Sequence, residues 1–207
     1  MRTASKKFVS ENCFIGILSC LLMVLLQTSS LQADEPASEK SKPADEKDRY
    51  SYNLRDHDRN GIGKFYLGRE IARVMGYQGA PWLERRTREQ EERLSLLPKA
   101  LKLKPGMAIA DIGAGSGVIS VILAEHVSPD GKVYAVDVQQ EMLDLLDKKM
   151  KKQGVDNIVP VLGTQKSPGL KPESIDLAIM VDVYHEFEFP YEMMQEISKA
   201  LKPFFFF

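Results

Sequence analysis

The chain has 207 residues, of which 43% are hydrophobic and 28% are charged, with 28 lysines and arginines against 29 aspartates and glutamates. This near balance of charge excludes an electrostatic case for a nucleic-acid partner. Both cysteines, Cys13 and Cys20, lie near the N-terminus. The rest of the chain therefore has neither a disulfide framework nor a cysteine metal site.

Residues 1–33 have the pattern of a targeting segment. A positively charged start precedes an apolar run, Cys13–Leu26, which has the length of a signal-peptide core and is short for a spanning helix. A cleavage site is available at Ala33, and an uncleaved membrane anchor is the alternative. Both assignments predict that the protein is exported (periplasmic or secreted) or anchored on the outer side of the membrane.

Two further segments precede the main domain. Residues 34–49 are polar and charged with almost no apolar side chains, which predicts a disordered linker. Residues 50–98 are predicted to form a helical extension, with helices over Leu67–Met75 and Trp82–Leu97. The acidic run that starts at Asp56 imitates a calcium loop but lacks its final glutamate, so we expect a plain turn and no metal site.

The most informative motif is the glycine loop Asp111-Ile112-Gly113-Ala114-Gly115-Ser116-Gly117. It follows an apolar run and leads into the apolar-periodic segment Val118–Ala124, the layout of a strand, a glycine turn and a helix. The dinucleotide fingerprint Gly-x-Gly-x-x-Gly requires a glycine at position 118, which is Val118. The spacing therefore disfavours a nicotinamide dinucleotide, and a tight turn without any ligand remains an alternative.

A second strand, Lys132–Asp137, ends in an acid about twenty residues past the loop. A carboxylate at that place can accept both hydroxyls of an adenosine ribose. The alternative role of Asp137 is to stabilise the N-terminus of the helix that follows.

The alternation of strands and helices continues to the end of the chain. We expect helices over Glu141–Gln153 and Tyr191–Leu201, and strands over Asn157–Leu162 and Ser174–Val183. Such alternation predicts right-handed crossovers, a parallel sheet and a three-layer α/β/α fold. Ligands of such sheets bind at the carboxyl ends of the strands.

Residues 95–203 resemble the first half of the class I S-adenosylmethionine (SAM)-dependent methyltransferases, of the type 11/25 group. The resemblance is carried by five motifs: Leu103-Lys104-Pro105-Gly106, the glycine loop 111–117, Val136-Asp137, Ile175-Asp176-Leu177-Ala178 and Ala200-Leu201-Lys202-Pro203. It implies a Rossmann-like SAM-binding core over residues 99–207, with SAM as the cofactor.

The end of the chain departs from this family. There, Leu-Lys-Pro is followed by two glycines and a fifth strand, whereas this chain continues with Phe204-Phe205-Phe206-Phe207. We therefore expect a sheet that is incomplete at its C-terminus, in a truncated form of a longer protein. A short form completed by a partner is the alternative.

The resemblance also implies site residues. The predicted cofactor-binding residues are Asp111, Gly113, Ala114, Gly115, Gly117, Asp137, Val138, Thr164, Gln165 and Asp182. Tyr184, His185 and Glu186 are the catalytic candidates facing the acceptor, with His185 as a general base or, alternatively, a helix cap. By analogy, Tyr66, Tyr77 and Trp82 are candidates for covering the SAM site and contributing to the acceptor pocket, or for docking the extension onto the core.

The function expected from the sequence is methyl transfer from SAM to a small-molecule acceptor, without nucleic acid. One alternative is a non-catalytic, exported nucleoside-binding remnant, and a less favoured one is a nicotinamide-dependent oxidoreductase. Export is in tension with SAM, which is made in the cytoplasm.

Overall fold

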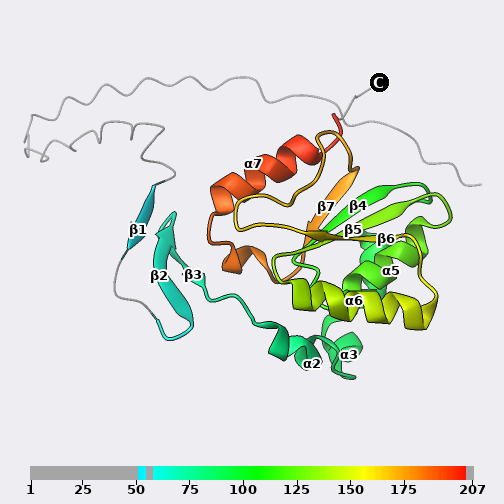
Figure 1. Cartoon of the computed structure of the whole chain (residues 1–207), viewed down its shortest axis with the longest axis horizontal. Coiled ribbons are helices and arrows are strands. Elements are labelled where there is room, and N and C mark those ends of the chain that lie inside the picture. The colour runs from blue at the N-terminus through cyan, green and yellow to red at the C-terminus, as the bar shows by residue number, and fades with distance from the viewer. Residues whose placement is uncertain (1–50, 55–57, 204–207) are drawn as a thin grey trace, which may run out of the picture. The chain divides into compact units, whose positions relative to one another are not determined.

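The computed structural model describes residues 51–54 and 58–203 (Figure 1). The predicted signal or anchor (1–33), the predicted linker (34–49) and the phenylalanine run (204–207) lie outside these residues. Within residues 51–54 and 58–203, no helix combines the length and apolarity needed to cross a membrane.

A parallel sheet forms the centre of the fold. Its strands are β4 (Ala108–Ile112), β5 (Lys132–Asp137), β6 (Ile158–Leu162) and β7 (Leu177–Met180), in the order β6-β5-β4-β7. All three neighbouring pairs are parallel. Helix α5 (Val118–Val127) connects β4 to β5, α6 (Gln140–Gln153) connects β5 to β6, and α7 (Pro190–Ala200) follows β7. The predicted α/β fold with a parallel sheet is confirmed.

The two faces of the sheet bury separate cores. Ile109 and Val133 pack with Leu123 of α5 and Leu146 of α6. The alternate positions along the strands point to the opposite face of the sheet. There, Ala110 packs with Met193 and Ile197 of α7. Because successive side chains of a strand alternate between faces, strands buried on both sides are apolar throughout.

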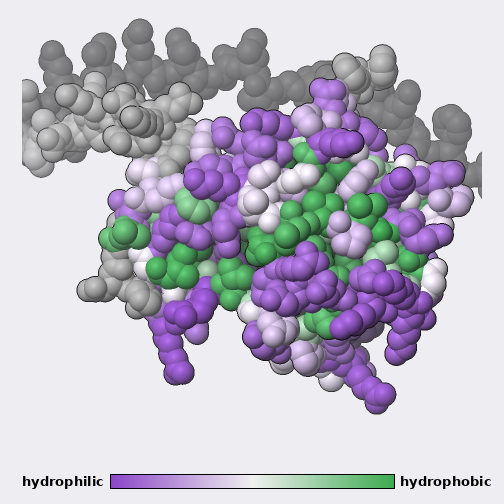
Figure 2. Space-filling model, viewed as in Figure 1, coloured by the Kyte–Doolittle hydropathy of each residue, from purple (hydrophilic) through white to green (hydrophobic). Residues whose placement is uncertain are grey.

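Figure 2 shows apolar surface between α7 and α6, with hydrophilic residues around it.

The expected helix over Leu67–Met75 is wrong. An antiparallel sheet of β1 (Tyr52–Leu54), β2 (Gly61–Tyr66) and β3 (Arg69–Ala72) occupies this region. Leu67 and Gly68 have φ of 50° and 79°, the backbone of a tight two-residue hairpin turn that reverses the chain. The side chain of Ile71 is fully buried between more exposed neighbours, which is the alternation of a strand.

The expected helix over Trp82–Leu97 is replaced by short pieces. These are α2 (Ala80–Leu83), α3 (Arg88–Glu92) and α4 (Leu97–Ala100), with 3-10 turns at Tyr77–Gly79 and Leu94–Leu96. Arg93 has a left-handed φ of 52°, which ends α3 because a left-handed residue cannot continue a right-handed helix. The extension is therefore a small antiparallel sheet followed by helical turns.

Candidate functional site

The structure has a cavity at the carboxyl ends of the parallel strands. One wall consists of the loops that follow the strands: Gly113–Gly115 after β4, Val138–Gln139 after β5, Thr164–Gln165 after β6 and Asp182–Val183 after β7. The opposite wall comes from the extension. Its residues are Val74, Met75, Trp82, Leu83, Arg85, Arg88 and Glu92. Ligands of parallel α/β sheets bind at this end of the strands.

The backbone amides of Gly113, Ala114, Gly115 and Gly117 are already occupied. Gly113 and Ala114 both donate to the carbonyl oxygen of Val136, over 2.8 and 2.9 Å, and Gly115 donates to Asp137 Oδ2 over 2.8 Å. Gly117 donates to the carbonyl of Ala114. A pyrophosphate site needs such amides to point at the ligand, so this loop is unsuited to a dinucleotide.

The loop requires glycine for space as well as for conformation. Gly113 has a φ of 73°, and a Cβ there would lie 2.3 Å from Val183 Cγ2. Gly117, by contrast, does not line the cavity: its φ is 79°, it precedes α5, and a Cβ there would lie 2.3 Å from Leu146 Cδ1. Among the predicted cofactor residues, Gly117 therefore has a packing role.

Asp137 has acceptor capacity left for a ligand. Its Oδ1 accepts from the amide of Gln139 over 2.9 Å and its Oδ2 from that of Gly115 over 2.8 Å. Burial raises the pKa of this carboxyl, and the amide hydrogen bonds oppose that rise. Each carboxylate oxygen has two lone pairs. The backbone amides therefore use only part of the acceptor capacity of Asp137, and the remainder suits the hydroxyls of a ribose.

Asp111 lies at the bottom of the cavity and is only 2% exposed. Ser120 Oγ donates to Asp111 Oδ2 over 2.6 Å. Burial raises the pKa of Asp111 to about 6; the Ser120 hydrogen bond and the charge of Arg88 lower it, and the charge of Asp137 raises it. The site thus has two acidic groups next to the glycine loop, which favours a ligand that carries positive charge.

Residues 74–79, here named the strap, are held over this site by side chains from the core. Gln139 Nε2 donates to the carbonyl of Met75, and the amide of Tyr77 donates to Gln139 Oε1, both over 2.9 Å. The amide of Met75 donates to Glu186 Oε1 over 3.3 Å. Sequence patterns did not predict this closure, since the groups held are peptide groups that every residue carries.

The predicted acceptor residues follow β7. Asp182, His185 and Glu186 line the cavity. His185 Nδ1 lies 3.7 Å from Asp182 Oδ1 and its Nε2 lies 4.0 Å from Glu186 Oε1. Burial raises the pKa of Glu186, while the Met75 amide and the charge of His185 lower it. Asp182 has a left-handed φ of 53°, and such strained conformations cluster at functional sites.

Several predicted residues lie elsewhere. Tyr184 is not part of the cavity wall, and its ring packs against Phe187, with centroids 5.7 Å apart, and beside Arg69. Tyr66 is buried in β2, and Tyr77 contributes to the strap without lining the cavity. Trp82 does line it and is 63% exposed. The other predicted cofactor residues lie in the cavity wall: Ala114, Val138, Thr164 and Gln165.

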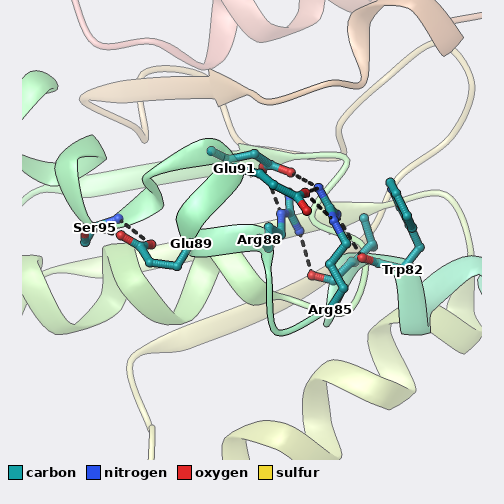
Figure 3. A network of polar contacts seen from close by, with 8 residues as sticks. Trp82, Arg85, Arg88, Glu89, Glu91 and Ser95 are labelled. Atoms are coloured by element: carbon teal, nitrogen blue, oxygen red, sulfur yellow. Dashed lines mark hydrogen bonds and ion pairs between the residues drawn. The ribbon is translucent and has the colours of Figure 1, made fainter.

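A network of arginines and glutamates in the opposite wall was not predicted (Figure 3). Arg85 bonds Glu91, Glu92 and the carbonyl of Trp82, and its guanidinium lies 4.1 Å from the centroid of the Trp82 ring. The charged pattern of this segment is also that of an exposed helix, so no signal in it marked Arg88, the buried member of the network, as part of the cavity wall.

A family model described as a methyltransferase domain matches residues 103–207, which is more than half of the chain. Over 81 residues the chain is 35% identical to a protein-L-isoaspartate O-methyltransferase of Methanopyrus kandleri, covering 39% of this chain and 36% of that relative. Over 106 residues it is 30% identical to a demethylmenaquinone methyltransferase of Lactobacillus johnsonii, covering 51% and 43%. The chain thus spans less than half the length of these two curated relatives.

A solved structure extends the likeness to the fold. The crystal structure of a SAM-dependent methyltransferase from Aquifex aeolicus superimposes with a TM-score of 0.61 at 28% identity, covering 63% of this chain and 70% of that one. In this chain the glycine loop and two carboxylates, Asp111 and Asp137, line one cavity. The chain belongs to the family of class I SAM-dependent methyltransferases.

Proposed function

We propose that this chain binds SAM in the cavity and transfers its methyl group to a small-molecule acceptor. One observation carries this proposal: the same cavity joins the cofactor-type residues after β4, β5 and β6 to His185 and Glu186 after β7. Methyl transfer needs a cofactor and an acceptor held in line, and it needs a base only where the acceptor must lose a proton.

The chain's residues fit each part of the cofactor. Asp137 would accept the two ribose hydroxyls, and Thr164 and Gln165 would lie beside the adenine. Asp111 and the glycine loop would lie around the amino-acid end of SAM. SAM supplies a methyl group that its positively charged sulfur makes reactive. The buried carboxylates of Asp111 and Asp137 give the cavity the negative charge that suits a ligand with a net positive charge.

His185 is the proposed proton acceptor for the methyl acceptor. Histidine is the side chain suited to proton transfer near neutral pH, and His185 is the histidine among the residues that line the cavity. Asp182 and Glu186, on either side of the ring, would stabilise the protonated imidazole. Glu186 also bonds the strap, which links the acceptor side of the cavity to its cover.

Membership of the family does not specify the methyl acceptor, so the acceptor class is part of this proposal. The names of the two curated relatives specify a protein L-isoaspartate and a demethylmenaquinone, so the shared domain leaves the acceptor open. The balanced charge of the chain favours an acceptor other than nucleic acid. The comparisons do not support the oxidoreductase or the non-catalytic remnant.

Calorimetric titration of the chain with SAM, S-adenosylhomocysteine and NAD tests the cofactor. We expect saturable binding of the first two and none of NAD. Release of S-adenosylhomocysteine from SAM in the presence of small-molecule extracts then tests transfer, with His185→Gln expected to slow turnover while SAM affinity is kept. Binding of NAD without SAM would contradict the proposal.

We also propose that residues 1–33 direct the chain out of the cytoplasm or anchor it. The support is the charged start followed by the apolar run Cys13–Leu26. Fractionation of the producing cells and N-terminal sequencing test this. A mature chain that starts at Asp34, or an uncleaved chain in the membrane fraction, is expected, and an uncleaved chain in the cytoplasmic fraction would contradict it.

A further inference from the structure

Arg88 is a buried cation in the wall of the cavity. It lies on α3, in the segment that precedes the matched residues 103–207, and it is 9% exposed. Burying a charge is costly unless the charge is paired. The partners of this guanidinium therefore indicate what it is for.

Part of the guanidinium is used inside the protein. Arg88 Nε donates to Glu92 Oε2 over 2.9 Å and Nη1 donates to the carbonyl of Leu83 over 3.0 Å. No residue in 51–54 or 58–203 hydrogen-bonds to Nη2, and within these ranges no buried side-chain nitrogen is left without a partner. Nη2 therefore keeps exposed surface, and Arg88 lines the cavity. The neighbouring Arg85, by contrast, uses all three of its nitrogens on Glu91, Glu92 and Trp82 (Figure 3).

The location of Arg88 is fixed against the glycine loop. Leu83, whose carbonyl it bonds, packs on Gly115, where a Cβ would lie 2.7 Å from Leu83 Cδ1. The charge of Arg88 also acts on Asp111, whose pKa it lowers. A cation and an anion thus lie close to each other at the glycine-loop end of the cavity.

The amino-acid end of SAM carries one charge of each sign, an ammonium and a carboxylate on the same carbon. Asp111 matches the ammonium. The carboxylate needs donors, and the amides of Gly113, Ala114, Gly115 and Gly117 are all occupied within the fold. Of the cations that line the cavity, Arg85 is fully engaged and His185 lies among the acids that follow β7. Arg88 is therefore the cation of the cavity wall that keeps an unused nitrogen.

We infer that Arg88 binds the α-carboxylate of SAM, opposite Asp111, so that the amino-acid end is held by a residue from outside the matched domain. This inference rests on the proposed function. The extension would then complete the cofactor site as well as cover it. An arginine suits this role because its planar guanidinium can bond the chain through one edge and a carboxylate through another.

A thermodynamic cycle tests directly whether the Arg88 guanidinium binds the α-carboxylate of SAM. The ligands are SAM and decarboxylated SAM, which differ only in the carboxylate, and the proteins are the 207-residue chain and Arg88→Gln. We expect Arg88→Gln to weaken the affinity for SAM by about tenfold to a hundredfold, the range for a charged hydrogen bond. It should change the affinity for decarboxylated SAM by about twofold or less, as for uncoupled groups. Arg86→Gln, an exposed neighbour with the same loss of charge, should change neither.

The possible results separate the inference from the function on which it rests. Equal weakening of both ligands would show that Arg88 only supports the wall, and unchanged affinity for both would remove it from the site. Both results overturn the inference while SAM binding stands. A chain that binds no SAM overturns the proposed function itself. If Arg88→Gln loses its circular-dichroism signature, Arg88→Lys repeats the cycle with the charge kept and the two-edged geometry lost.

Discussion

Asp111 is an ionisable group that the fold buries almost completely. Its ordinary pKa is 3.8, and burial raises it to about 6. The folded state therefore binds this proton more tightly than the unfolded chain does. As the pH rises from about 4 to 6, the folded state must give up a proton that it holds well, so this group lowers the free energy of unfolding.

We predict that Asp111→Asn is more stable than the original chain at pH 7. The amide keeps the shape and can still accept the hydrogen bond from Ser120. The gain in the free energy of unfolding should be on the order of 2–3 kcal/mol at pH 7 and should disappear near pH 3.5. Urea unfolding at several pH values measures it, with the exposed Asp156→Asn as control. A gain that does not depend on pH would contradict the buried-charge account.

Asp137→Ala should weaken SAM binding by about 1–3 kcal/mol, because a carboxylate that accepts two hydroxyls is lost. Asp144→Ala, on the exposed side of α6, is the matched control and should leave affinity unchanged. Titration calorimetry measures both. Since Asp137 also accepts the amide of Gly115, unfolding curves should accompany the titrations. An unchanged affinity would exclude Asp137 from the cofactor site.

At the scale of residues, sequence reasoning found those whose role depends on local order. Gly113, Gly115 and Asp137 stand next to the strands that position them, so spacing alone indicated them. Arg88 escaped because its neighbours in a charged segment give no sign that it is buried. Gln139 escaped because its partners are distant in sequence, the peptide groups of residues 75 and 77. A residue that binds backbone leaves no matching side chain in the sequence.

At the scale of elements, the strap is held in place by hydrogen bonds from side chains of the core. Gln139→Ala removes both bonds to its peptide groups. We expect the amide of Tyr77 to exchange with solvent about tenfold faster, which corresponds to the loss of one hydrogen bond of ordinary strength. Hydrogen exchange followed by mass spectrometry measures this. Gln140→Ala, which loses only an exposed bond to Asp144, should leave strap exchange unchanged, and equal acceleration in both variants would contradict the clamp.

The elements of the core were predictable because their periods are unambiguous. The predicted strand Lys132–Asp137 is β5 without change, and the predicted helix Glu141–Gln153 differs from α6 by one residue. The error over Leu67–Met75 arose where a positive-φ turn at Leu67 and Gly68 divides the apolar residues between two strands. A turn at a leucine has no compositional mark, since left-handed leucine is rare.

At the scale of the whole molecule, the cavity has walls from two parts of the chain that are remote in sequence. We predict that S-adenosylhomocysteine protects both walls at once. At a hundred times its dissociation constant it should add about 2.7 kcal/mol to the free energy of unfolding. Hydrogen exchange should slow in residues 74–92 as well as in the loops after β4, β5 and β6. Protection confined to those loops would show that the extension is not part of the cofactor site.

The three-layer core could be predicted from alternation alone, whereas the attachment of the small antiparallel sheet could not. Lys64 Nζ lies 3.4 Å from the centre of the Phe189 ring, and the Tyr52 hydroxyl bonds Glu192 on α7. These contacts join residues more than 120 positions apart. The sequence around this lysine and this tyrosine does not indicate which aromatic ring or which acid each will contact.

The way in which the strap is held has a consequence for how its sequence can vary. Gln139 and Glu186 bond the amides of Met75 and Tyr77 and the carbonyl of Met75, groups that almost any residue provides. Side chains in the strap are thus free to diverge between related proteins while the cover keeps its place. Proline is the exception at positions 75 and 77, because it has no amide hydrogen to donate. Divergence in this segment therefore need not mean loss of the closed site.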